Sequence, residues 1–155
     1  LPTIDATTLK VALDAGSCTA VEIGPSMLFR KKHIPKTRWS TRVRIVADAK
    51  SAHGRIILVC DDPNVAKLAA TDLIEAGHHD VVLLEGGFDA WDAAGYPTEA
   101  SPDVPPDRDC IDYLFFVHDR HAGNREAMKQ YLAWETGLIA QLDEQDRKLF
   151  QVGVA

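Results

Sequence analysis

The sequence has few cysteines, and their spacing excludes two classes of small protein. The three cysteines among 155 residues are Cys18, Cys60 and Cys110. They are far apart and form no CxxC pair, so the chain has neither a disulfide framework nor the ligand spacing of a zinc site. Because their number is odd, at least one thiol should be free, and we expect no metal.

Long apolar runs and an excess of positive charge are also lacking. No run approaches the ~20 apolar residues that cross a bilayer, and the N-terminal LPTIDATTLK lacks the charged and apolar regions of a signal peptide. We therefore expect a cytoplasmic protein without membrane contact. A net charge of -6 argues against a surface built for nucleic acid. The chain begins at Leu1 rather than Met, which suggests a fragment of a longer polypeptide or a trimmed tag.

The residues that are present predict one domain with an appendage. With 46% apolar residues, the chain can bury one proper core, and it is too short for two full domains. Helical and strand-like segments alternate, which predicts a parallel sheet with right-handed crossovers. The predicted elements are helices over 7–15, 65–76 and 88–94 and strands over 19–23, 55–59 and 80–84.

Cys60 directly follows the predicted strand 55–59, RIILV, whose continuous apolar run suits a central strand covered on both faces. In parallel sheets, chemistry lies beyond the carboxyl ends of the strands. We therefore take Cys60 as the candidate catalytic residue. By contrast, residues 24–44 are expected to form an irregular, positively charged region. Its basic residues are Arg30, Lys31, Lys32, Lys36, Arg38, Arg42 and Arg44.

Several strings closely resemble a rhodanese domain. They are HIP at 33–35, RIILVC at 55–60, AKLAATDLIEAGHHDV at 66–81 and LEGGFDAWDAAGYP at 84–97. The last is the most specific, because its glycines permit turns closed to other residues and Trp91 buries a large area. The resemblance implies an α/β rhodanese-like domain over residues 1–99, with a parallel sheet and helices on both faces.

The resemblance also implies a reaction. The interval from Cys60 to the pair Ala69 and Ala70 reproduces that between the family's catalytic cysteine and its own alanine pair. Cys60 would then attack the outer sulfur of thiosulfate or mercaptopyruvate, hold it as a persulfide, and pass it to cyanide or a thiol. A small sulfur-containing anion and a thiophilic acceptor are the implied partners, and we expect no cofactor.

The loop after Cys60 departs from the family pattern in ways that weaken catalysis. Active members follow the cysteine with two variable residues, glycine, one more residue and arginine, but here Pro63 replaces the glycine and Val65 the arginine. Asp61 and Asp62 add negative charge beside the thiol, which would raise its pKa. The predicted substrate-binding residues of this loop are Asp61, Asp62, Asn64 and Val65.

Basic residues could replace the missing charge. The family's Asp-Val-Arg after the first strand is here Glu22-Ile23-Gly24, which removes another arginine. We therefore include Arg38 and Arg42 among the predicted substrate-binding residues, and Lys67 could assist them.

Three other functions are considered for this sequence. A related phosphatase would need Cys-x5-Arg, but Ala66 occupies the arginine position. A non-catalytic rhodanese module for binding, regulation or assembly is the main alternative to an enzyme. The cluster His118, Asp119, Arg120 and His121 could hold a metal, although nothing nearby completes a site.

The C-terminal third is expected to form a linker and a helical extension. Residues 100–109 are rich in Pro and Asp and read as a linker, and 110–155 as the extension, with an extended segment over 112–117. A helix capped by Asn124 would carry an apolar stripe. This tail resembles the C-terminal extension of bacterial proteins built from several rhodanese domains, so upstream domains or a second subunit are the expected partners.

Overall fold

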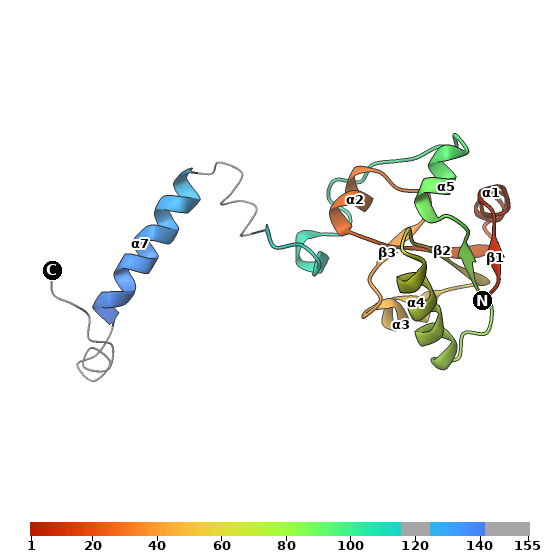
Figure 1. Ribbon diagram of the computed structural model, residues 1–155, viewed down its shortest axis with the longest axis horizontal. Coiled ribbons are helices and arrows are strands. Elements are labelled where there is room, and N and C mark those ends of the chain that lie inside the picture. Colours follow the sequence, from red (N-terminus) through yellow and green to blue (C-terminus); the bar gives the residue numbers. More distant parts are fainter. Residues whose placement is uncertain (116–124, 142–155) are drawn as a thin grey trace. The chain divides into compact units, whose positions relative to one another are not determined.

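The computed structural model describes residues 1–115 and 125–141. It divides the chain into two compact units, Leu1–Tyr113 and Leu114–Ala155. The first unit contains a five-stranded sheet, and the described part of the second consists mainly of one long helix (Figure 1).

All strands of the sheet are parallel, and their order is β1-β5-β4-β2-β3. The strands are β1 (Thr3–Ile4), β2 (Cys18–Ile23), β3 (Arg38–Ser40), β4 (Arg55–Val59) and β5 (Val81–Leu84). The helices are α1 (Ala6–Ala15), α2 (Ser26–Lys31), α3 (Ile45–Asp48), α4 (Pro63–Glu75), α5 (Gly87–Ala93) and α7 (Arg125–Gln141), with 3-10 turns at Ala49–Ser51 and Asp107–Asp109.

The central strand β4 divides the core into two layers. Its side chains alternate, so that Ile56 and Leu58 face one cluster while Ile57 and Val59 face the other. Helices α3 and α4 cover the first face, and α1 and α5 cover the second (Figure 1). The predicted α/β fold, with helices on both faces of a parallel sheet, is therefore confirmed.

Local signals in the sequence begin and end the helices as expected. The Asp5 carboxylate accepts a hydrogen bond from the Thr8 N–H at 2.7 Å and caps α1, which ends where Gly16 adopts φ +62°. Helix α4 ends before Gly77, as its apolar spacing predicted. Both helices could be predicted from the sequence because their caps and apolar spacing involve only residues close together in the chain.

Two parts of the N-terminal unit differ from the sequence prediction. Residues 24–44 are not wholly irregular, because they contain α2 and β3. Strand β1 was also not predicted. Both strands are short and owe their existence to pairing with distant strands, β3 with β2 and β1 with β5. Neither is long enough to show an apolar period of its own.

Residues 101–113 belong to the first unit and contact helix α2 through Arg30. The Ser101 N–H donates to the Arg30 carbonyl at 2.9 Å, and the Arg30 guanidinium binds the Pro105 carbonyl and the Asp107 carboxylate. Cys110 is buried. The first unit thus continues to Tyr113, beyond the boundary at residue 99 that the sequence predicted, because Arg30 provides bonding partners for the expected linker.

Helix α7 confirms the helix expected after Asn124, although Asn124 itself, Leu142 and the cluster at 118–121 lie outside the described residues. The extended segment expected over 112–117 is not seen in its described part, where Asp112 lies in a turn. Over residues 1–115 and 125–141, no helix is both long and apolar enough to cross a membrane.

The packing predicts which leucine of α4 stabilises the fold. Leu73 is fully buried beneath the sheet, so Leu73→Ala should lower the free energy of unfolding by about 2–5 kcal/mol. Urea denaturation followed by circular dichroism measures this loss. Leu68 lies on the same helix and is 47% exposed, so Leu68→Ala is the control and should change stability by only about 0.5 kcal/mol. Equal losses in the two variants would contradict this packing.

Candidate active site

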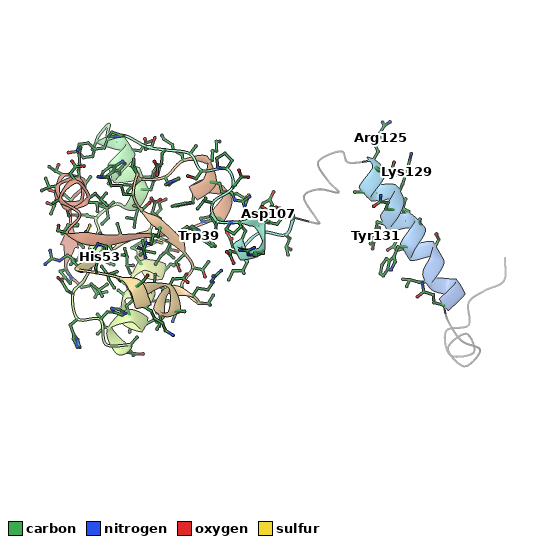
Figure 2. All side chains as sticks on the ribbon, turned by 180° about the vertical axis from the view of Figure 1, so that it is seen from behind. Trp39, His53, Asp107, Arg125, Lys129 and Tyr131 are labelled. Carbon is green, nitrogen blue, oxygen red and sulfur yellow. The ribbon has the colours of Figure 1, made fainter. Side chains whose placement is uncertain are left out.

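A cleft of about 760 Å³ lies at the carboxyl ends of β2 and β4. Half-buried Cys60 follows β4 and lines this cleft. Trp39, on the adjacent edge strand β3, also lines it. Figure 2 shows Trp39 toward the opposite end of the unit from His53, which precedes β4. The cleft therefore occupies the edge of the sheet at which parallel-sheet proteins place their chemistry.

Asp61 connects the Cys60 loop to helix α5. One oxygen of its carboxylate, Oδ1, accepts hydrogen bonds from the N–H groups of Phe88 at 2.7 Å and Asp89 at 3.3 Å. The residue before α5 is Gly86, whose lack of a side chain leaves these donors to be satisfied from elsewhere. A residue distant in sequence thus caps α5.

Asp62 caps the N-terminus of helix α4. Its Oδ1 accepts hydrogen bonds from the N–H groups of Asn64 at 2.8 Å and Val65 at 3.4 Å. Pro63 occupies the first turn, where the missing N–H costs little and the fixed φ suits a helix. The N-terminus of α4 is consequently well formed, but two of its free N–H groups already bind the Asp62 side chain.

The surroundings of Cys60 act on the pKa of its thiol in opposite directions. Burial is the largest cause that raises the pKa of this thiol, and the Asp61 and Asp62 carboxylates raise it further. Hydrogen bonds from the backbone of Asp62 and Ala66 oppose them and lower the pKa. The net direction is upward, so the thiolate is scarcer at neutral pH than for an ordinary cysteine.

Glu22 is a buried acid that lines the cleft. It is 7% exposed, and its Oε1 accepts bonds from the Ile34 N–H at 2.8 Å and the Thr37 hydroxyl at 2.6 Å. Burial raises the pKa of the Glu22 carboxyl, while these two hydrogen bonds lower it. Glu22 therefore ties the segment after α2 to the end of β2.

The loop and α5 approach each other so closely that only glycine fits at position 87. Gly87 has φ +58°, and a Cβ atom there would lie 2.7 Å from the Cys60 carbonyl oxygen and 2.4 Å from Asp61 Oδ1. This contact joins the first residue of α5 to the candidate catalytic loop itself. The position of Cys60 depends on this contact.

Residues 5–94 match the family model described as a rhodanese-like domain. The chain belongs to the rhodanese-like family. The thiosulfate sulfurtransferase from Pseudomonas aeruginosa is 30% identical, with a TM-score of 0.66, over 91% of this chain and 27% of that chain. The present chain thus spans about a quarter of that protein's length.

Two further solved structures resemble this rhodanese-like chain. The rhodanese-like domain of the Alr3790 protein from Anabaena sp. is 26% identical, with a TM-score of 0.58, over 74% of this chain and 90% of that chain. A protein from Rhodopseudomonas palustris, described as a possible tyrosine phosphatase, is 25% identical, with a TM-score of 0.53, over 64% of this chain and 85% of that chain. The comparison with curated proteins found no match.

The rhodanese-like cleft brings together most of the residues predicted from the sequence. Its lining includes Cys60, Asp61, Asp62, Val65 and Arg42. Arg42 is engaged by Asp72 of α4, to which its guanidinium donates at 2.8 and 3.2 Å.

Two predicted substrate-binding residues lie outside the lining. Arg38 is exposed on β3 and donates to the Ser51 hydroxyl at 3.0 Å. Asn64 is exposed at the start of α4, where its N–H serves the Asp62 cap. Lys67, which was considered as an additional cation, is exposed on α4 and also lies outside the lining.

Sequence reasoning missed the apolar part of the cleft. The missed lining residues include Ile23, Leu28, Phe29, Trp39 and Phe88, together with Glu22. Leu28, Phe29 and Trp39 belong to α2 and β3, in the stretch predicted to be irregular. Of these residues, Phe88 could most easily have been predicted to line the cleft, because it follows the Gly86-Gly87 pair at the end of a buried strand.

The contact at position 87 predicts an unusually large effect of a small substitution. Gly87→Ala and Gly95→Ala both place a side chain at positive φ, which costs roughly 1–2 kcal/mol. Gly95 has open space where a Cβ would lie, whereas Gly87 does not. Gly87→Ala should therefore lose clearly more free energy of unfolding than its Gly95→Ala control in urea denaturation. Similar losses of free energy of unfolding in the two variants would show that the loop can move away from the added Cβ atom without cost.

The charge of Asp62 predicts a change in the titration of Cys60. Asn is an equally good cap, so Asp62→Asn should keep α4 intact and lower the pKa of the Cys60 thiol. The rate of Cys60 alkylation by iodoacetamide, followed by peptide mass analysis against pH, reports that pKa. Asp80→Asn, at the opposite ends of the strands, is the control and should leave the profile unchanged. An unmoved profile in Asp62→Asn would refute the electrostatic account.

Proposed function

We propose that the chain carries a sulfurtransferase domain in which Cys60 receives a sulfane sulfur from thiosulfate or a similar donor and passes it to a thiophilic acceptor. The observation that carries this proposal is the position of Cys60. Its sulfur lies just beyond the carboxyl end of β4 and before the first turn of α4, and it lines the cleft.

The proposed reaction has two displacement steps. The Cys60 thiolate forms a bond to the outer sulfur of the donor. With thiosulfate, the bond between the two donor sulfurs breaks and sulfite leaves with the electron pair, which leaves a persulfide on Cys60. Cyanide or a thiolate then attacks the terminal sulfur and releases the Cys60 thiolate. The backbone of Asp62 and Ala66 acts to lower the pKa of the Cys60 thiol and so favours negative charge on its sulfur at both stages.

Similarity to known proteins supports the proposal at the level of the family. The chain belongs to the rhodanese-like family, and one of its structural relatives is described as a thiosulfate sulfurtransferase. Phosphatase chemistry has less support, because buried Ala66 stands where a phosphate-binding arginine would be required.

A non-catalytic binding or regulatory module is the second candidate. The specific observation in its favour is the Asp62 carboxylate, which takes the N–H groups of Asn64 and Val65 that a bound anion would otherwise use. The raised pKa of the Cys60 thiol points the same way. The Asp62 cap weakens the binding of a dianion, and the raised pKa lowers the fraction of thiolate, but neither removes the nucleophile.

The partners and the location are also part of the proposal. Upstream rhodanese domains are proposed as partners, since the relative from Pseudomonas aeruginosa covers 91% of this chain with only 27% of its own length. A second subunit is the alternative. The cytoplasm is the proposed location, because sulfur transfer requires Cys60 to remain a reduced thiol.

Intact-mass analysis tests whether Cys60 carries sulfur. The wild-type protein, exposed to thiosulfate or to mercaptopyruvate, should gain the mass of one sulfur atom and lose it on addition of cyanide. Cys60→Ser should gain none. Cys18→Ser is the matched control, because Cys18 is buried at the other end of the sheet, and it should behave like the wild type. If a folded protein with reduced Cys60 gains no sulfur from either donor, the second candidate replaces the first.

A further inference from the structure

The cleft beside Cys60 is large for a small inorganic anion. Its volume of about 760 Å³ falls within the range of pockets that hold drug-sized organic ligands, roughly 300–1,000 Å³. Thiosulfate has only a few heavy atoms and would leave most of this space to water. The size of the cleft therefore points to a bulkier ligand.

The wall of the cleft is apolar and held in place. Its apolar side chains include Ile23, Leu28, Phe29, Trp39, Val65 and Phe88. The Trp39 indole N–H donates to the Gly24 carbonyl at 2.8 Å, and the Phe29 ring stacks on His33 with 3.9 Å between centroids. Because these aromatic rings are already fixed, a ligand that contacts them need not order them.

Exposed Leu28 marks the outer part of this wall. Its side chain is 60% exposed, on the first turn of α2. An exposed leucine alone needs no explanation. Here it continues an apolar surface that leads inward through Phe29 to the strand ends, so an apolar ligand could bury it.

Charge near the sulfur disfavours a dianion. Asp61 and Asp62 directly follow Cys60, and the N–H groups of Asn64 and Val65 bind the Asp62 carboxylate. Within the described lining, the cations are Lys31, Lys32 and Arg42. Lys32 pairs with Asp92 at 2.7 Å, and Arg42 pairs with Asp72 at 2.8 Å. The positive charges of both side chains are therefore partly neutralised within the protein. A donor carrying two negative charges on its sulfur-bearing end therefore meets carboxylates where the family pattern has an arginine.

We propose that this cleft selects a sulfane-sulfur donor with an apolar group of aromatic size and a single negative charge, and discriminates against thiosulfate. The inference rests on the proposed sulfur transfer through Cys60. An aryl thiosulfonate is the simplest compound of this class. The Cys60 thiolate bonds to its terminal sulfur, the bond between the two donor sulfurs breaks, and the aryl sulfinate leaves with the electron pair.

Three donors separate the effect of size from that of charge. Benzenethiosulfonate is large and monoanionic, methanethiosulfonate is small and monoanionic, and thiosulfate is small and dianionic. The rate at which each loads sulfur on Cys60 is measured by intact mass and divided by its rate with a free thiol in solution. Benzenethiosulfonate should exceed methanethiosulfonate by about tenfold or more, as an apolar pocket distinguishes groups of different size. Methanethiosulfonate should in turn exceed thiosulfate.

Variants of the wall and the loop test the source of the preference. Leu28→Ser should reduce the ratio of the benzenethiosulfonate loading rate to the methanethiosulfonate loading rate. Because Leu28 is exposed, the variant should keep its fold, which circular dichroism checks. Val43→Ser is the control, because Val43 is 83% exposed and lies outside the lining. Val65→Arg, which restores the cation of the family pattern, should raise the thiosulfate rate relative to both thiosulfonates.

Binding to Cys60→Ser separates this inference from the proposed function. In NMR spectra of that variant, benzenesulfinate, which is the leaving group, should shift the Trp39 indole N–H resonance, whereas sulfite should not. Absence of loading by any donor would overturn the proposed function, and an unmoved Trp39 resonance would overturn the aromatic site. Loading by thiosulfate at a normalised rate equal to that of benzenethiosulfonate would overturn the donor preference alone.

Discussion

The carboxylates of Asp61 and Asp62 hold the end of β4 to the first turns of two helices. Asp61 binds two N–H groups of α5, and Asp62 binds two of α4. Such charge-assisted bonds are stronger than bonds between neutral groups. Cys60 lies immediately before this double attachment, and Gly87 lies against its carbonyl. The shape of the cleft floor and the position of the sulfur both follow from these bonds.

The same bonds weaken the electrostatic support for a thiolate. A helix N-terminus stabilises a nearby negative charge by about 0.3–1 kcal/mol, and a capping carboxylate is itself such a charge. In this chain the cap comes from Asp62, so the benefit of α4 is shared between that carboxylate and the sulfur of Cys60. A side-chain cap is worth about 1 kcal/mol to the helix. The loop thus gains stability from a residue that makes the thiol less acidic.

The sequence predicted the parts of this arrangement that depend on near neighbours. The strand before Cys60, the helix after it and the Gly86-Gly87 turn could all be recognised from periodicity, glycine and family resemblance. The contacts that make the site could not, since they join distant positions. Asp61 caps α5 through its bond to Phe88, which lies 27 residues later in the chain. Likewise, Asp72 binds Arg42 across 30 residues, so the charge expected to serve the substrate is partly engaged within the protein.

A raised thiol pKa does not by itself make Cys60 inert. Below its pKa, each unit of increase reduces the thiolate fraction about tenfold, but the nucleophilicity of the thiolate rises with a Brønsted coefficient of about 0.4–0.5. That gain is roughly threefold per unit, so the net loss of rate is also only about threefold. The burial and the carboxylates that raise the pKa of Cys60 therefore impose a modest penalty on attack. The larger difference between an active domain and a binding module must come from how the cleft holds the donor, where the apolar wall and the absent loop arginine act directly.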